Sequence, residues 1–259
     1  MPDEKQCIRI AAAGDVHAHP ETRDRLEASF ERIQNESDLI LLAGDLTTLG
    51  DPAEAVVLAE ACRGSSLPIL AVLGNHDLHR DHGEEIAGIM RAAGVTMLDR
   101  SFTVVEVEGV EVGIAGTKGF VGGFPGSALA DFGEQMLRSL YAETSAEVAA
   151  LGEGLQAVAH CPLRIVLLHY SPSAETLVGE PEGIWTYLGS ERLAAPIAEH
   201  RPDLVLHGHA HAGTFEGFIG AVPVYNVAVH VTRRDWWVVE LGEKAKPEVE
   251  RVVLEKPAG

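Results

Sequence analysis

The sequence predicts an α/β fold built on a largely parallel sheet. Two observations lead to this prediction. Short, continuous apolar runs alternate with segments of helical composition through the first third of the chain, and Asp15, Asp45 and Asn75 each follow one of these runs. Such runs are typical of strands buried on both faces, and their alternation with helices indicates βαβ units. We therefore expect parallel strands whose carboxyl ends place these three residues along one edge of a sheet.

The first third of the chain contains three predicted strand–helix units. The first strand covers Cys7–Ala13 and is followed by helical sequence to about residue 35. The second unit has a strand at 38–43 and a helix at 51–62. The third has a strand at 67–73 and a helix that ends near residue 93. No sequence repeat accompanies this period, so it reflects topology and not a solenoid.

The pattern changes in the second part of the chain. Two strands flank the turn residues Glu108 and Gly109, which indicates a hairpin. Gly152 and Gly154 lie within a stretch of helical composition and would weaken it, so a broken helix is one alternative there. No linker is evident, and we expect one domain, residues 1–259, with two packed sheets covered by helices. The remaining predicted elements are hairpin strands at 103–107 and 110–115, a helix at 132–159, a strand at 164–169, a helix at 190–200, a strand at 203–207, and three or four antiparallel strands at 213–254.

Composition narrows the possible functions. The chain has 259 residues, 46% of them hydrophobic, which is enough to bury a core without disulfides or structural metals. Its net charge of −19 argues against a surface for duplex DNA or anionic membranes. Cys7, Cys62 and Cys161 form no CxxC pair, and we expect reduced thiols. No signal region or apolar run of membrane-spanning length is evident, so we expect a cytoplasmic protein.

Seven oxygen or nitrogen ligands lie in or near four short motifs that follow one another in a fixed order. The motifs are GDVH, GDL, GNHD and GHAH, and a single histidine precedes the last. Ligands held at strand ends that converge on one point are what a two-metal hydrolytic site requires. The candidate metal ligands are Asp15, His17, Asp45, Asn75, His169, His209 and His211.

Taken singly, these motifs differ in how strongly they indicate a functional site. D-x-H and Gly-Asp also occur in solvent-exposed turns and helix caps. Asn and His are poor strand formers, so GNHD and GHAH at strand ends indicate function more strongly. His207, His209 and His211 alternate, and in an extended segment all three would face one side. We expect His207 to support the ligands and not to bind metal itself.

In combination, the motifs resemble those of the calcineurin-like metallophosphoesterases, from Asp15 to His211. The resemblance implies a four-layer α-β-β-α sandwich of two mixed sheets with helices on both outer faces. It also implies a catalytic role for His76 near the leaving group, with Asp77 orienting the His76 ring. By the same resemblance, the metals divide as follows: Asp15, His17 and His211 bind one, Asn75, His169 and His209 bind the other, and Asp45 bridges both.

This resemblance implies a dinuclear, metal-dependent phosphoester hydrolase, in which a metal-bridging hydroxide attacks phosphorus in line. The donors are oxygen and nitrogen without sulfur, which suits two divalent transition-metal ions. Mn, Fe, Zn, Co and Ni all fit, with Mn as the preferred candidate. The strong negative charge predicts a small phosphoester substrate, with no long nucleic acid and no membrane as partner. The oligomeric state has no signal in the sequence.

Differences from two known groups of this family narrow the type of phosphoesterase but leave several functions open. Purple acid phosphatases carry tyrosine where this chain has Thr48, and protein Ser/Thr phosphatases have an arginine that the segment GDLTTLG lacks. GDVH with GNHD looks more like the bacterial phosphodiesterase-type branch. The alternatives are a phosphomonoesterase, a short-strand nuclease, or a catalytically idle binding scaffold of the same fold. The Gly-rich segment with Lys118, Phe120 and Phe124 is either a lid or a surface loop.

Overall fold

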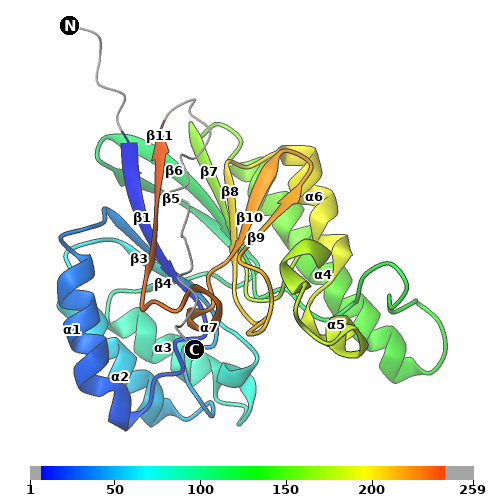
Figure 1. Ribbon diagram of the computed structural model, residues 1–259, viewed down its shortest axis with the longest axis horizontal. Coiled ribbons are helices and arrows are strands. Elements are labelled where there is room, and N and C mark those ends of the chain that lie inside the picture. The colour runs from blue at the N-terminus through cyan, green and yellow to red at the C-terminus, as the bar shows by residue number, and fades with distance from the viewer. Residues whose placement is uncertain (1–6, 243–259) are drawn as a thin grey trace, which may run out of the picture.

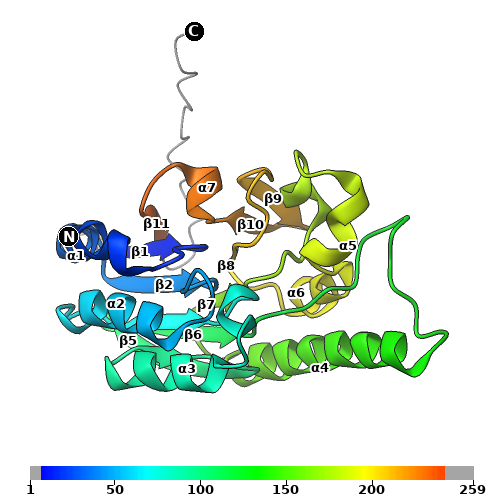
Figure 2. The same ribbon diagram turned by 90° about the horizontal axis from the view of Figure 1, so that it is seen from below.

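The structure is a computed structural model, and residues 7–242 are described below (Figure 1). Two sheets pack face to face, and helices cover both outer faces (Figures 1 and 2). The layer between the sheets is the largest apolar cluster, to which both sheets contribute, for example through Ile10, Leu41, Ile114 and Leu206. The predicted four-layer α-β-β-α sandwich is therefore confirmed.

The first sheet has the strand order β11-β1-β2-β3-β4, in which β1 to β4 are parallel and β11 is antiparallel to β1. The helices α1, α2 and α3 cover its outer face. Their buried residues, such as Phe30 and Leu58, pack on the outward side chains of β1 and β2. The bounds are β1 Cys7–Ala13, α1 Arg23–Ile33, β2 Leu39–Ala43, α2 Pro52–Arg63, β3 Ile69–Val72, α3 Gly83–Ala92, β4 Thr96–Met97 and β11 Trp237–Gly242.

The second sheet has the order β5-β6-β7-β8-β10-β9, with α4 and α6 on its outer face (Figure 2). The predicted hairpin is its first pair, and both turn residues, Glu108 and Gly109, have positive φ angles of 50° and 80°. The bounds are β5 Ser101–Val107, β6 Val110–Gly116, α4 Gln135–Ala157, β7 Leu163–Leu167, α5 Trp185–Leu188, α6 Ala194–His200, β8 Leu204–His207, β9 Glu216–Ile219, β10 Val222–Asn226 and α7 Val229–Thr232.

The helix α4 is continuous, so the alternative of a break at its glycines is not realised. Gly154 is buried where α4 crosses β6, and a Cβ at this position would lie 3.2 Å from the Cβ of Ala115. A glycine there lets the helix approach the sheet closely. Burial of one helix face against the sheet outweighs the modest helix propensity of glycine, which costs about 1 kcal/mol relative to alanine.

The prediction of antiparallel strands throughout the C-terminal part is only partly right. β9 and β10 form an antiparallel hairpin, but β10 pairs in parallel with β8. The chain then passes through α7 and enters the other sheet as β11. Strand composition does not reveal the partner of a strand, because pairing is decided by the edge that the fold leaves open. The rest of the predicted region, 243–254, lies outside the described residues.

The arrangement brings the carboxyl ends of both parallel strand sets to one side of the molecule. β1, β2 and β3 end there in the first sheet, and β7 and β8 end there in the second. The loops that follow these five strands carry all the candidate ligands. Among the described residues, no helix is both long and apolar enough to span a membrane.

Candidate metal centre

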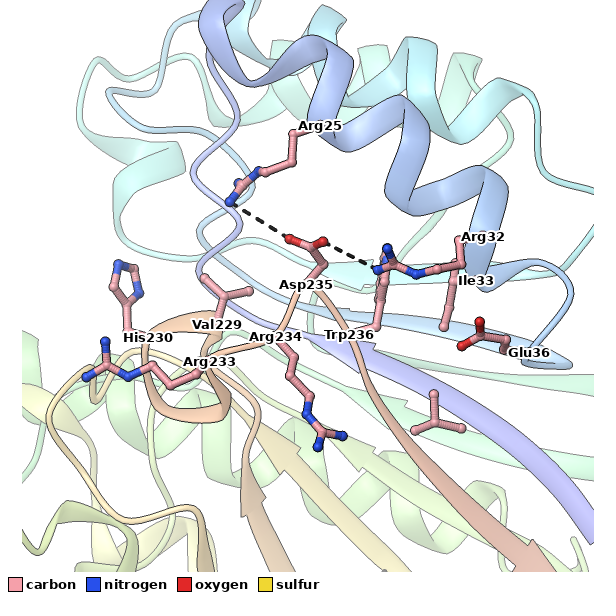
Figure 3. Close-up of a pocket in the computed structure, with 11 residues that line it drawn as sticks. Arg25, Arg32, Ile33, Glu36, Val229, His230, Arg233, Arg234, Asp235 and Trp236 are labelled. Atoms are coloured by element: carbon pink, nitrogen blue, oxygen red, sulfur yellow. Dashed lines mark hydrogen bonds and ion pairs between the residues drawn. The ribbon is translucent and has the colours of Figure 1, made fainter. Parts of the chain in front are cut away.

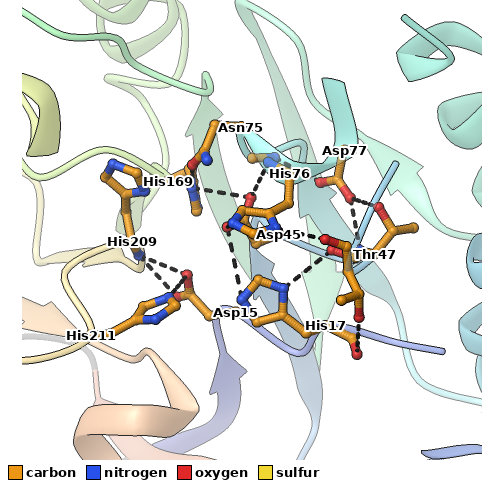
Figure 4. Close-up of polar contacts among 12 residues, drawn as sticks. Asp15, His17, Asp45, Thr47, Asn75, His76, Asp77, His169, His209 and His211 are labelled. Carbon is orange, nitrogen blue, oxygen red and sulfur yellow. Dashed lines mark hydrogen bonds and ion pairs between the residues drawn. The ribbon is translucent and has the colours of Figure 1, made fainter. Parts of the chain in front are cut away.

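The predicted ligands converge in two groups that share Asp45 (Figure 4). One group contains Asp15, His17, Asp45 and His211, and the other contains Asp45, His169 and His209. Within each group the candidate ligand atoms all lie within 4.8 Å of one another. Asn75 joins the second group, since its Oδ1 is 2.9 Å from Nε2 of His169. The division of ligands and the shared aspartate match what the family resemblance implies, although their binding of metal stays a prediction.

Both sheets supply the site. From the first sheet, Asp15 and His17 follow β1, Asp45 follows β2, and Asn75 follows β3 and precedes a short 3₁₀ helix, His76–Leu78. From the second sheet, His169 follows β7, and the GHAH histidines follow β8. The centre therefore lies where the two sheets meet at their carboxyl ends, held by loops on rigid strands.

The backbone is strained at four of the seven candidate ligands. The φ angles of Asp15, His17, Asp45 and His209 are 57°, 47°, 49° and 70°, in the left-handed region that side-chain-bearing residues rarely adopt. Such conformations cost about 1–3 kcal/mol each and cluster at functional sites. Here the left-handed turn directly after each strand directs the side chain back toward the centre.

The motif glycines make room for the carboxylates. A Cβ at Gly74 would overlap the carboxylate of Asp45, and a Cβ at Gly208 would overlap the carboxylate of Asp15. The glycine before Asn75 and the glycine before His209 are thus required by the close approach of a neighbouring loop, and not by their own φ angles. This explains why the motifs contain glycine at these positions.

The two carboxylates are buried without a strong cation beside them. Asp15 and Asp45 are 0% and 1% exposed, and within residues 7–242 neither pairs with a lysine or arginine. Burial acts to raise the pKa of Asp15, but hydrogen bonds and nearby histidines hold it below its usual range. Nε2 of His211 is 2.8 Å from Asp15, and this contact raises the pKa of His211. Buried carboxylates need cations, so the donor set fits divalent metal ions.

The rings of three site histidines are fixed by backbone carbonyl oxygens. A carbonyl only accepts, so Nδ1 of each ring carries the proton, and Nε2 is left with its lone pair for a metal or substrate. This is the arrangement expected of imidazole ligands in a metal centre. The distances are 2.9 Å from His169 Nδ1 to Ala43 O, 3.3 Å from His17 Nδ1 to Thr47 O, and 2.7 Å from His76 Nδ1 to Thr48 O.

The prediction that Asp77 orients the His76 ring is wrong, because the Thr48 carbonyl oxygen holds that ring. The buried Asp77 carboxylate instead accepts hydrogen bonds from the backbone N–H and hydroxyl of Thr47 and from the N–H of Gly74 (Figure 4). Asp77 thus positions the loops that carry Asp45 and Asn75. His76 itself lies at the centre, with its ring 4.6 Å from that of His17 and its backbone N–H bonded to Asp45.

His207 does not share a face with the other two histidines. Its Nδ1 lies 2.8 Å from Gly208 O and its Nε2 lies 2.9 Å from the Thr176 hydroxyl, so both nitrogens are occupied. The expectation of one common face assumed an extended segment, and the left-handed turn at His209 breaks it. Burial lowers the pKa of His207 to about 4 and that of His209 to about 3, so both rings are neutral near pH 7.

Two aromatic residues that no sequence motif singles out border the metal centre. The ring of His230 stacks on His211, with centroids 4.0 Å apart and planes 10° apart. The sequence alone predicts only a solvated or core residue at His230. Tyr170 lies beside His209, with centroids 4.4 Å apart. His230 belongs to no motif, and no sequence signal could have placed it here. Tyr170 directly follows His169, which was the available signal.

The Gly-rich segment is anchored at its start and contributes one basic residue near the centre. The buried Glu147 of α4 accepts hydrogen bonds from the Thr117 hydroxyl and the Gly119 N–H. Nζ of Lys118 lies 5.1 Å from the ring centroid of Tyr170. Phe124 is 1% exposed within a small apolar cluster, so it packs locally and is not available as a lid aromatic.

Comparison with known proteins agrees with the family that the motifs resemble. The profile of the calcineurin-like phosphoesterases matches residues 8–213, whereas no curated protein sequence matches. Among solved structures, phosphopantetheinyl hydrolase (PptH) from Mycobacterium tuberculosis has a TM-score of 0.65 at 15% identity, covering 86% of this chain and 90% of its own. The protein TT1561 of Thermus thermophilus has a TM-score of 0.54 at 22% identity, covering 85% and 89%.

A third solved structure, GAP50, described as the anchor in the inner membrane complex of Plasmodium, has a TM-score of 0.58 at 15% identity and covers 92% of this chain and 82% of its own. These likenesses concern the fold, because all three identities are low. The family profile spans most of the chain and includes every motif described above. The chain therefore belongs to the calcineurin-like phosphoesterase family.

Proposed function

We propose that this protein is a dinuclear, metal-dependent phosphoester hydrolase that acts on small phosphodiesters. The observation that carries the proposal is the pair of ligand groups that share Asp45. A carboxylate common to both groups, with three further donors for each ion, is the arrangement that a two-metal centre needs. The preferred candidate for both ions is Mn²⁺, and a cytoplasmic location is part of the same proposal.

When bound, two divalent ions supply a hydroxide nucleophile near neutral pH and attract the phosphoryl oxygens. The protein's own contribution begins with Asp45, which fixes the spacing between the two groups. His76 then serves the leaving group: the Thr48 carbonyl oxygen accepts its Nδ1–H, and when a second proton is bound at Nε2, the imidazolium can donate that proton to the departing oxygen. The side chain of His76 is 32% exposed, so a bound substrate can reach it.

The preference for diesters rests on the residues after Asp45. A phosphomonoester carries one more negative charge than a diester, and an arginine clamp would favour it. The segment from Leu46 to Leu49 contains no basic residue. The net charge of −19 should also repel long polyanions, whereas a small diester is influenced mainly by the local metal charge.

The test is hydrolysis of bis(p-nitrophenyl) phosphate by protein first stripped of metal and then loaded with Mn²⁺. We expect turnover that depends on the added metal and that is absent from an Asp45→Asn variant prepared in the same way. Turnover that is equal with and without metal, or equal in the variant, would contradict the proposal.

The alternative from a different class is a binding scaffold of the same fold. GAP50, described as an anchor, shares the fold with this chain. Scaffolds of this kind tend to lose ligands or the leaving-group histidine, but all seven candidate ligands and His76 are present here. Measurable metal-dependent turnover in the assay above separates the two functions.

A further inference from the structure

A cavity of about 630 Å³ lies between α1 and the connection from α7 to β11 (Figure 3). Four of the residues that line it are arginines, and we call this space the arginine cavity. Arg25 and Arg32 lie on α1, and Arg233 and Arg234 lie on the connection after α7, so the four line one space only in the folded protein. The side chains of Arg25 and Arg32 reach toward Asp235, whereas those of Arg233 and Arg234 point away from it (Figure 3).

The charge of the arginine cavity is opposite to that of the protein. Its lining contains four arginines and two acids, Glu36 and Asp235, which gives a local excess of two positive charges. The whole chain carries −19. A local reversal of sign within an acidic protein attracts anions to that one place.

The four arginines differ in their ion pairs. Arg25 and Arg32 both face Asp235, with N–O distances of 3.9 Å and 3.4 Å (Figure 3). These pairs are partly exposed and long, so they are weak and can rearrange around a ligand. Neither Arg233 nor Arg234 takes part in any side-chain ion pair within residues 7–242.

A buried donor lines the same cavity. Trp236 is 7% exposed, and its indole Nε1–H has no acceptor among the described residues. A buried N–H without an acceptor is unusual and costs about 1–3 kcal/mol. The Nε1 atom itself has almost no exposed surface, so a ligand in the cavity could accept this hydrogen bond only after a side chain of the wall moved.

One histidine ring connects the cavity to the metal centre. His230 lines the cavity, and its ring stacks on His211 with centroids 4.0 Å apart. His230 also lies 5.8 Å from the ring of His17. The arginine cavity and the predicted site of the ion that Asp15, His17 and His211 are expected to hold are therefore in contact through the ring of His230.

We propose that the arginine cavity binds a phosphate group, and that this group is a second phosphate carried by the substrate of the metal centre. Arginine forks match phosphate oxygens in pairs, and several arginines around one space suit a dianion better than a single carboxylate. The second half of this inference rests on the proposed phosphodiesterase activity. A free phosphate that acts as an effector has the same chemistry, and the experiment distinguishes the two sources.

The first arm measures binding alone. The Asp45→Asn variant is treated with chelator, so that the metal centre cannot hold anions, and is titrated with inorganic phosphate by calorimetry and by tryptophan fluorescence. We expect a millimolar or tighter Kd that weakens with added salt. The double variant Arg233→Gln/Arg234→Gln in this background should bind about tenfold more weakly or worse. Arg63→Gln/Arg91→Gln removes two exposed arginines, one on α2 and one on α3, as a charge-matched control and should bind as before. Absence of binding overturns the cavity as a phosphate site.

The second arm measures kcat/KM in the metal-loaded protein for thymidine 5′-(p-nitrophenyl phosphate), with and without a 3′-phosphate. We expect the 3′-phosphate to raise kcat/KM about tenfold, and Arg233→Gln/Arg234→Gln to abolish this preference. The same variant should hydrolyse bis(p-nitrophenyl) phosphate as the unmodified protein does.

The two arms can fail separately. If no substrate is hydrolysed, the proposed function fails, while the binding arm still decides the cavity. If inorganic phosphate binds but the 3′-phosphate does not raise kcat/KM, the proposal that the cavity binds a second phosphate of the substrate is overturned, and the ligand is a free anion.

Discussion

The carboxylate of Asp77 ties two loops of the metal centre together, and its removal tests the site architecture quantitatively. The side chain is fully buried. Oδ1 accepts hydrogen bonds from the backbone N–H of Thr47 at 2.8 Å and from its hydroxyl at 2.6 Å. Oδ2 accepts from the N–H of Gly74 at 2.8 Å and from that of Leu46 at 3.2 Å. One side chain thus serves the loop after β2 and the loop after β3.

Asp77→Ala leaves three buried backbone N–H groups without an acceptor, since only the Thr47 hydroxyl can turn elsewhere. At about 1–3 kcal/mol for each of the three unsatisfied groups, the free energy of unfolding should fall by about 3–9 kcal/mol. Asp77→Asn keeps one acceptor oxygen, but its amide N–H₂ faces N–H donors. Burial raises the pKa of Asp77, so removing the buried charge offsets part of the loss of stability. We therefore expect Asp77→Asn to lower the free energy of unfolding by about 1–2 kcal/mol.

The assay is urea unfolding of chelator-treated protein, so that metal binding does not enter the comparison. Asp81→Asn is the matched control: Asp81 is exposed and follows the same 3₁₀ helix, and asparagine tolerates its positive φ of 59°. This control should change the free energy of unfolding by less than about 0.5 kcal/mol. A loss below about 1 kcal/mol for Asp77→Ala, or equal losses at both positions, would refute the reasoning.

Four further predictions concern the centre itself. Asp45→Asn should lower the metal content below two ions per chain by mass spectrometry and abolish turnover, because a neutral amide cannot replace a shared carboxylate; full metal content would contradict this. His76→Ala should cut the rate roughly 10²–10⁴-fold at unchanged metal content. The loss of rate should be smaller for substrates that release p-nitrophenol, which leaves without a general acid. Loss of metal from this variant would show that His76 is a metal ligand. Gly74→Ala should displace Asp45 and impair metal binding, whereas Gly88→Ala, with no atom near its new Cβ, should not; equal effects would exclude the steric reason. In kcat/KM assays, an aryl diester should be preferred to the matched monoester, and a tenfold preference for the monoester would refute the proposed diester specificity. Duplex DNA should be a poor substrate at low salt, and rapid cleavage of DNA would refute the proposed restriction to small substrates.

The strands of the first sheet could be predicted closely because they are buried on both faces. β2 is a continuous apolar run, β1 is interrupted only by Arg9, and Gly-Asp follows each of them, so their ends are visible in the sequence. The C-terminal strands could not be placed in the same way. β11 has strand composition, but its pairing with β1 depends on an edge that exists only after the first sheet has formed. Local pattern predicts the element, and tertiary structure decides its partner.

The candidate ligands could be predicted because they lie in compact motifs at strand ends. Their supporting residues could not. The ring of His76 is held by a backbone carbonyl oxygen, that of Thr48, which has no side-chain signature. His230 and the arginine cavity combine segments about two hundred residues apart, and no spacing rule connects Arg25 with Arg233. Sequence reasoning thus finds donors that the chemistry requires and misses contacts that only the fold creates.

Strain and burial at the centre have a common explanation. Asp15 and Asp45 are buried acids without a lysine or arginine partner in the described part of the chain, and both have left-handed backbone conformations. Each feature alone destabilises the folded protein. They persist because packed strands fix the ends of the loops, and because Gly74 and Gly208 admit the carboxylates. A divalent cation would offset the buried charge, and the packed strands fix the loops that carry its donors. Preorganisation of this kind keeps the ligands from relaxing toward solvent, at a cost in stability that the two large apolar layers can sustain.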